Sequence, residues 1–173
     1  MSAPGKAPPV ALAAAISEDR QRASIVSAGR EIGGARLLVD LVWYDHPRGA
    51  VARLADLYTG HDPVAVVIDP MSQAGTLLRP LADAGVMVTL VKPQDVAVAH
   101  GSFLDLVNDR GLAHLDQPPL TAAVRAGQQR PLAGAQAWDR KVAVDQSPLT
   151  AATLATWAFL AWEVLSQPGT WVV

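Results

Sequence analysis

The sequence contains no cysteine, which excludes disulfides, thiolate catalysis and cysteine-based zinc sites. It also contains no glycine-rich phosphate loop, since neither G-x-x-x-x-G-K-[ST] nor a strand-linked G-x-G-x-x-G occurs. The four histidines lack the spacing of metal ligands, and His100 fits the exposed face of its predicted helix. Charged residues make up only 17% of the chain and apolar ones 50%, which indicates a compact globular protein rather than a disordered one.

A chain of 173 residues fits one domain, which we expect over residues 10–173 behind a flexible lead-in over residues 1–9. The apolar stretch that opens this domain is too short for a signal peptide. The apolar segment 149–165 contains three threonines and Glu163, and it falls short of the roughly 20 residues that a bilayer requires. We therefore expect a buried core helix there and no association with membranes.

The apolar patterns predict an α/β domain. Three strands joined by short links, at Val10–Ile16, Ala23–Gly29 and Ala35–Tyr44, predict an antiparallel meander. Two further strands, at Val64–Ile68 and Val86–Val91, alternate with helices. The helices are expected at 49–58, 73–84, 93–108, 120–126 and from Ser147 onward. This order predicts a mixed five-stranded sheet, three antiparallel strands and then two parallel ones, with the first strand central and helices on both faces.

Two acids stand at the ends of buried elements. Asp69 follows the buried strand "VAVVI", where ligands bind in open α/β sheets, although it also suits a turn cap helped by Pro70. Asp145 precedes the last helix, and its alternative role is helix capping, for which Ser147 is the better placed residue. Two carboxylates at one end of a sheet would suit Mg²⁺ or Mn²⁺, which prefer oxygen ligands.

Positive charge is concentrated late in the chain, although a net charge of −2 does not indicate a nucleic-acid-binding protein. Between Arg110 and Lys141 there are four arginines and one lysine against two aspartates. Arg125, Arg130, Arg140 and Lys141 are either solvated surface residues or, beside the two acids, contacts to phosphate groups.

One further alternative rests on Asp69 alone. The stretches "VVIDPM" and "LVKP" are similar to the phosphoacceptor and Lys-Pro motifs of bacterial receiver domains. Asp69 and Lys92 fall on adjacent strands with one helix between them, which is too close for that fold. A small-molecule or phosphoacceptor α/β domain with Asp69 as its key residue remains as an alternative.

Three segments in order, 64–91, 100–132 and 137–157, resemble the C-terminal nuclease domain of phage terminase large subunits, particularly those of actinobacterial phages and prophages. The resemblance runs from about residue 9 to residue 159. It implies a ribonuclease H-like fold and metal-dependent cleavage of double-stranded DNA during genome packaging. It also implies the terminase ATPase domain, the small terminase and the portal as partners, in the cytoplasm of an infected bacterium. We expect no ATPase domain within these 173 residues.

The resemblance assigns roles to individual residues. The family's strand-end acid falls on Asp69 and its late acid on Asp145, as ligands of Mg²⁺ or Mn²⁺. The family's basic W-x-R element falls on Trp138 and Arg140, which places them near the DNA backbone. The other candidate DNA contacts are the neighbouring cations Lys141, Arg130 and Arg125.

The first strand departs from the family. The family pattern V-D-x-S-x-D-R matches "AAAISEDR" at Ser17, Asp19 and Arg20, and it puts the catalytic aspartate on Ala15. In the family that acid bridges two metal ions, which together stabilise the attacking and leaving oxygens. We therefore expect weak metal binding and little or no cleavage, with Asp19 or Glu18 as possible substitutes. The alternative is a catalytically inactive module of the same fold that binds DNA or packaging proteins.

Overall fold

The computed structural model describes residues 7–168, so most of the predicted lead-in lies outside the described residues. A mixed six-stranded sheet, in the order β5–β4–β1–β2–β3–β6, forms the centre of the domain. The strands are β1 (Val10–Ile16), β2 (Ala23–Arg30), β3 (Leu37–Asp45), β4 (Ala65–Ile68), β5 (Thr89–Leu90) and β6 (Leu112–His114). β1, β2 and β3 form the predicted antiparallel meander, and β4 pairs parallel with β1 on its other side. The predicted α/β architecture with a central first strand is confirmed.

The predicted count of five strands is wrong by one. β6 pairs parallel with β3 at the sheet edge, in the stretch between the helices predicted at 93–108 and 120–126, where no strand was expected. Its three residues are too few to show an alternating pattern, so pairing with β3, and not its own sequence, makes it a strand. At the opposite edge, the strand predicted over Val86–Val91 is reduced to the exposed pair Thr89–Leu90.

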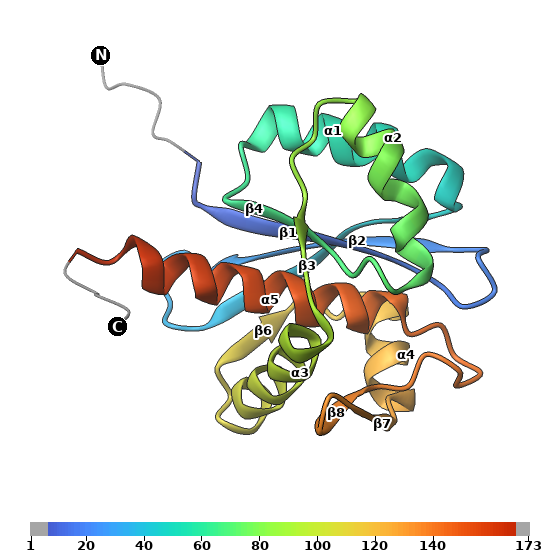
Figure 1. Ribbon diagram of the computed structural model, residues 1–173. Helices are drawn as coiled ribbons and strands as arrows, with labels where there is room; N and C mark the ends of the chain where they lie inside the picture. The colour runs from blue at the N-terminus through green and yellow to red at the C-terminus, as the bar shows by residue number, and fades with distance from the viewer. Residues whose placement is uncertain (1–6, 169–173) are drawn as a thin grey trace, which may run out of the picture.

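Helices cover both faces of the sheet, as predicted. α1 (Ala50–His61) and α2 (Leu78–Asp83) lie on one face, and α3 (Pro93–Asn108), α4 (Pro118–Ala126) and α5 (Ser147–Ser166) lie on the other (Figure 1). Two 3₁₀ segments, Pro47–Gly49 and Gln73–Leu77, precede α1 and α2. α2 begins later than predicted, which places Pro80 in its first turn, where the missing backbone N–H costs no helical hydrogen bond.

Alternation along β1 divides the core into two layers. Leu12, Ala14 and Ile16 pack toward α1 and α2, whereas the other side of the strand faces α5 with alanines only: Ala11, Ala13 and Ala15. Small side chains on this side allow α5 to pack closely with alanines of its own, including Ala151, Ala152 and Ala155, all fully buried. Among the described helices, α5 alone is long and apolar enough to cross a membrane. Half of its most apolar stretch is buried within the domain.

A hairpin lies between α4 and α5, where no strand was predicted. β7 (Gln129–Leu132) and β8 (Ala135–Trp138) pair antiparallel through a two-residue turn, Ala133-Gly134. Both turn residues have positive φ (50° and 79°), as a tight hairpin turn requires. The hairpin packs against α3 and carries Arg130 on β7, with Arg140 two residues beyond β8.

Candidate functional site

Asp69 directly follows β4 and takes part in the turn that comes after it. Its Oδ1 accepts a hydrogen bond from the Met71 N–H at 2.9 Å, and its carbonyl oxygen accepts one from Ser72 Oγ at 2.7 Å. The parallel register, which pairs Ala13 with Val67, brings Asp69 level with Ala15 on the neighbouring strand. Asp69 therefore caps a turn with one carboxylate oxygen while standing beside the position of the missing acid.

Asp145 caps α5, the role that the sequence favoured for Ser147. Its Oδ1 accepts the Ser147 N–H at 2.8 Å, and its Oδ2 accepts the hydroxyls of Ser147 at 2.9 Å and Tyr44 at 3.1 Å. Ser147 is the first helical residue, and its hydroxyl in turn accepts a hydrogen bond from Ser24 at 2.7 Å. Burial and the adjacent Asp145 carboxylate raise the pKa of Tyr44 to about 12.

Ala15 lies between the two acids. Asp69, Ala15, Ser24 and Tyr44 occupy neighbouring strands in that order, because Ala15 pairs with Ser24 and Ser24 with Tyr44. At about 4.8 Å per strand, the Cα atoms of Asp69 and Tyr44 are roughly 14 Å apart. Asp145 contacts the Tyr44 end of this row, so a side chain at position 15 would have to connect the acids, and alanine has no oxygen for that purpose.

The side chains present do not fit a pair of divalent cations. Among residues 7–168 there is no group of three or more histidine or acidic side chains able to hold a metal ion. Both carboxylate oxygens of Asp145 are already hydrogen-bonded to Ser147 and Tyr44. The Asp19 carboxylate, the proposed substitute, accepts hydrogen bonds at Oδ1 from Ser17 Oγ at 2.7 Å and from the Gln21 N–H, which lower its pKa.

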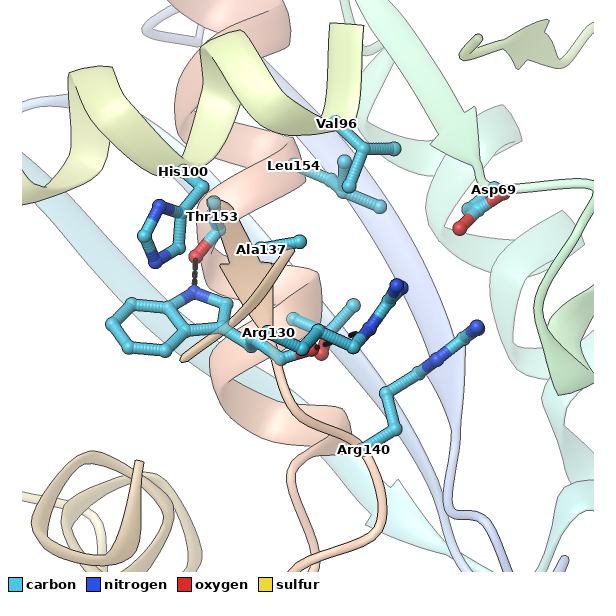
Figure 2. Close-up of a pocket in the computed structure, with 10 residues that line it drawn as sticks. Asp69, Val96, His100, Arg130, Ala137, Arg140, Thr153 and Leu154 are labelled. Atoms are coloured by element: carbon cyan, nitrogen blue, oxygen red, sulfur yellow. Dashed lines mark hydrogen bonds between the residues drawn. The ribbon is translucent and has the colours of Figure 1, made fainter. Parts of the chain in front are cut away.

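Three hollows surround this row of residues. The inner cavity, of about 20 Å³, lies between Asp69, α3, α5 and the hairpin, and its wall includes His100, Arg130, Trp138, Arg140 and Thr150 (Figure 2). The cavity over Ala15 is smaller, about 10 Å³, and is lined among others by Glu18, Ser72, Arg140, Gln146 and Thr150. The outer hollow, of about 350 Å³, is lined by Glu18, Arg130, Asp139, Arg140 and Lys141.

Trp138 fixes the hairpin against the helices. Its indole N–H donates to Thr153 Oγ1 at 2.8 Å, a bond drawn as a dashed line at Thr153 in Figure 2. Thr153 in turn donates to the Leu149 carbonyl. Its ring meets His100 edge to face, with the centroids 4.5 Å apart. Its carbonyl oxygen accepts a hydrogen bond from Arg130 Nε at 3.2 Å. The hairpin thus holds Arg130 in place.

His100 is a buried residue, contrary to the expected exposed position. Its side chain is 3% exposed, and this burial lowers its pKa. Its Nε2 atom has no hydrogen-bond partner within the described part of the chain. Helical spacing carries the missed signal, since His100 lies three residues from both Ala97 and Phe103, which are also buried.

The structure separates the four candidate cations. Arg130, Arg140 and Lys141 meet at the outer hollow, and Arg130 and Arg140 also reach the inner cavity. Arg125 lines a different cavity, beside β6 and α4, together with His114 and Asp116. Across residues 7–168, Arg130, Arg140 and Lys141 form no ion pair.

No family model matches this chain, and no curated protein sequence matches it. Among solved structures, the large terminase of bacteriophage HK97 superposes with a TM-score of 0.68 and 16% identity over 91% of this chain, which spans 40% of that terminase. The large terminase nuclease of thermophilic phage G20c matches with a TM-score of 0.64 and 13% identity, over 86% of this chain and 81% of that one. The nuclease domain of the Thermus phage P74-26 large terminase matches with a TM-score of 0.62 and 14% identity, over 86% of this chain and 78% of that one. The chain therefore has the ribonuclease H-like fold of phage large terminase nuclease domains.

Proposed function

We propose that residues 10–173 form a single nuclease-type domain of a DNA-packaging terminase whose DNA cleavage is impaired by Ala15. The observation that carries this proposal is the row of residues across one end of the sheet, in which Ala15 stands between Asp69 and the Tyr44–Asp145 pair. The G20c nuclease has been crystallised with magnesium and with cobalt, which supports a divalent-metal nuclease as the ancestor of this chain.

The residues of this chain divide into a binding part and an incomplete hydrolytic part. Arg130, Arg140 and Lys141 converge on one hollow, where they outnumber the two acids Glu18 and Asp139, and the remaining positive charge suits the phosphates of double-stranded DNA. Asp69 and Asp145 remain where the family has acids, but without a carboxylate at position 15 they do not make a Mg²⁺ or Mn²⁺ pair. By the same resemblance, the ATPase domain, the small terminase and the portal are the proposed partners, in the cytoplasm of an infected bacterium.

Plasmid cleavage in Mn²⁺ tests the proposal. We expect little nicking by the chain itself and at least about tenfold faster nicking by Ala15→Asp, equivalent to about 1.4 kcal/mol of barrier. Ala15→Asn is the matched control, because it adds the same bulk without a charge and should remain inactive. Asp69→Ala in the Ala15→Asp background should abolish the restored cleavage.

The other outcomes separate the alternatives. Cleavage by the unaltered chain that Asp69→Ala removes would show that position 15 is not the missing ligand, and Asp19 or Glu18 would become the substitute to test. DNA binding without cleavage by any variant would favour the inactive DNA-binding or packaging-interaction module. A chain that neither binds nor cuts DNA would refute the terminase proposal.

A further inference from the structure

Arg140 occupies a central place among the three hollows. It lines the inner cavity with Asp69, the cavity over Ala15 with Ser147, and the outer hollow with Lys141. Figure 2 shows Arg140 and Arg130 extending from the hairpin side of the inner cavity toward the side where Asp69 lies. The Arg140 side chain is half-buried, and within residues 7–168 it has neither an ion pair nor a side-chain hydrogen bond.

The charges around the inner cavity favour an anion. One carboxylate, Asp69, faces two guanidinium groups, and an oxygen of that carboxylate already accepts the Met71 N–H. A divalent cation placed there would meet two positive charges and one negative charge. Guanidinium groups, in contrast, bind phosphate through paired, charge-assisted hydrogen bonds.

Unpartnered polar atoms in the walls indicate a polar occupant. Thr150, which lines both the inner cavity and the cavity over Ala15, has a buried Oγ1 that finds no partner within residues 7–168. His100 Nε2 in the inner cavity and Gln146 Oε1 beside Ala15 are in the same condition, and both side chains are 3% exposed. Buried polar atoms are nearly always hydrogen-bonded. The Thr150 hydroxyl can donate to a ligand oxygen, and so can His100 Nε2 when it carries the ring proton, whereas Gln146 Oε1 only accepts and requires a water or another donor.

The sizes of the hollows distinguish a phosphate from a base. The inner cavity of about 20 Å³ holds one water-sized group and no nucleobase. The outer hollow of about 350 Å³ shares Arg130 and Arg140 with it and can hold a whole phosphate group. A phosphate in the outer hollow could therefore be bound by the two guanidinium groups that also line the inner cavity.

We propose that Arg140, assisted by Arg130, forms an anion site beside Ala15 that binds a DNA backbone phosphate without a divalent cation. This inference rests on the proposed function, because it takes DNA as the ligand. It goes further by assigning the cationic role at this sheet edge to an arginine. If this is so, the chain binds DNA through arginine at the place where a metal pair would otherwise do so.

Fluorescence anisotropy of a labelled DNA duplex tests this inference, in EDTA and in Mg²⁺ at matched ionic strength. The unaltered chain should bind equally well in both, within about twofold. Arg140→Gln should weaken binding in EDTA by about tenfold, the equivalent of about 1.4 kcal/mol. Arg53→Gln is the matched control, because Arg53 lies on α1, on the opposite face of the sheet (Figure 1). The DNA affinity of this variant should change by less than about twofold.

Ala15→Asp adds a second readout. In EDTA its new carboxylate should pair with Arg140 and weaken DNA binding by about tenfold, and Mg²⁺ should restore the affinity. Binding by the unaltered chain that requires Mg²⁺, or Arg140→Gln binding as tightly as the parent, would overturn this inference and leave DNA as the partner. Absence of DNA binding in both buffers would instead refute the proposed function itself.

Discussion

The hydrogen bond between Trp138 and Thr153 should determine whether the hairpin stays attached to the domain. The Trp138 indole N–H donates to Thr153 Oγ1 at 2.8 Å, and this contact joins β8 to α5. Thr153 is 3% exposed, so water cannot readily replace either partner. Because β7 carries Arg130 and Arg140 follows β8, loosening this contact should disturb both arginines.

The expected loss of unfolding free energy follows from the hydrogen-bonding groups that each substitution leaves unpaired. Thr153→Val keeps the shape of the side chain, but it leaves the indole N–H unpaired and removes the hydrogen bond to the Leu149 carbonyl. An unsatisfied buried group costs about 1–3 kcal/mol, and we expect a loss of unfolding free energy in that range. Trp138→Phe leaves Thr153 still bonded to Leu149, so the double variant should lose less than the sum of the two, by about 1 kcal/mol.

Urea denaturation of the two single variants and the double variant measures this coupling. Thr156→Val is the matched control on the same helix, because the buried Thr156 Oγ1 has no partner among the described residues. Removing that hydroxyl should leave the stability unchanged or raise it. Additive losses within about 0.5 kcal/mol, or equal losses for Thr153→Val and Thr156→Val, would refute the role given to this hydrogen bond.

Two further predictions concern pH. Burial lowers the pKa of His100, so the unfolded chain holds that proton more tightly; the unfolding free energy should be full above about pH 6.5 and fall below it. In urea titrations at several pH values, His100→Phe should remove this pH-dependent part of the unfolding free energy. An unchanged dependence of the unfolding free energy on pH would contradict the prediction. The pKa of Tyr44 is raised to about 12, so the stability it contributes should be complete below about pH 10 and lost as the pH rises toward 12. Tyr44→Phe should flatten that loss, and an ultraviolet titration showing Tyr44 to ionise near pH 10 would exclude the contact with Asp145.

The elements that could be predicted from the sequence are those with a pattern of their own. β1 and α3 have the predicted bounds, Val10–Ile16 and Pro93–Asn108, because an apolar run and a helical period mark each of them. β6 and the β7–β8 hairpin have strands of three or four residues with polar neighbours. Such short strands depend on a partner strand, and for β6 the partner is β3, which is distant in sequence and leaves no local pattern. In the hairpin the partners are adjacent, but each has four residues and β7 contains Pro131, which argues against a strand.

The candidate site was predictable only in part, for the same reason. Asp69 and Asp145 stand beside elements with a clear pattern, so their places at the ends of β4 and α5 could be anticipated. The contact of Tyr44 with Asp145 depends on the register of β3, which shifts opposite Ile25 and Val26 of β2 because β3 has one extra residue there, Val42. A bulge shifts the side chains that follow it, and nothing in a single sequence locates it.

The alanines of β1 explain why the fold does not need an acid at position 15. Ala11 and Ala13 lie on the side of β1 that packs closely against α5. Ala15 lies on the same side of the strand, with 4% of its surface exposed. A carboxylate in that place would be a nearly buried charge, which costs several kcal/mol unless a cation compensates it. Alanine removes that cost and completes the apolar row, whereas Arg140 remains at the edge of the site without an acid from β1 to pair with. On the proposed function, alanine at position 15 would leave the hydrolytic site without a ligand and would still suit the core of the domain, so the fold and the chemistry at this end of the sheet would depend on different residues.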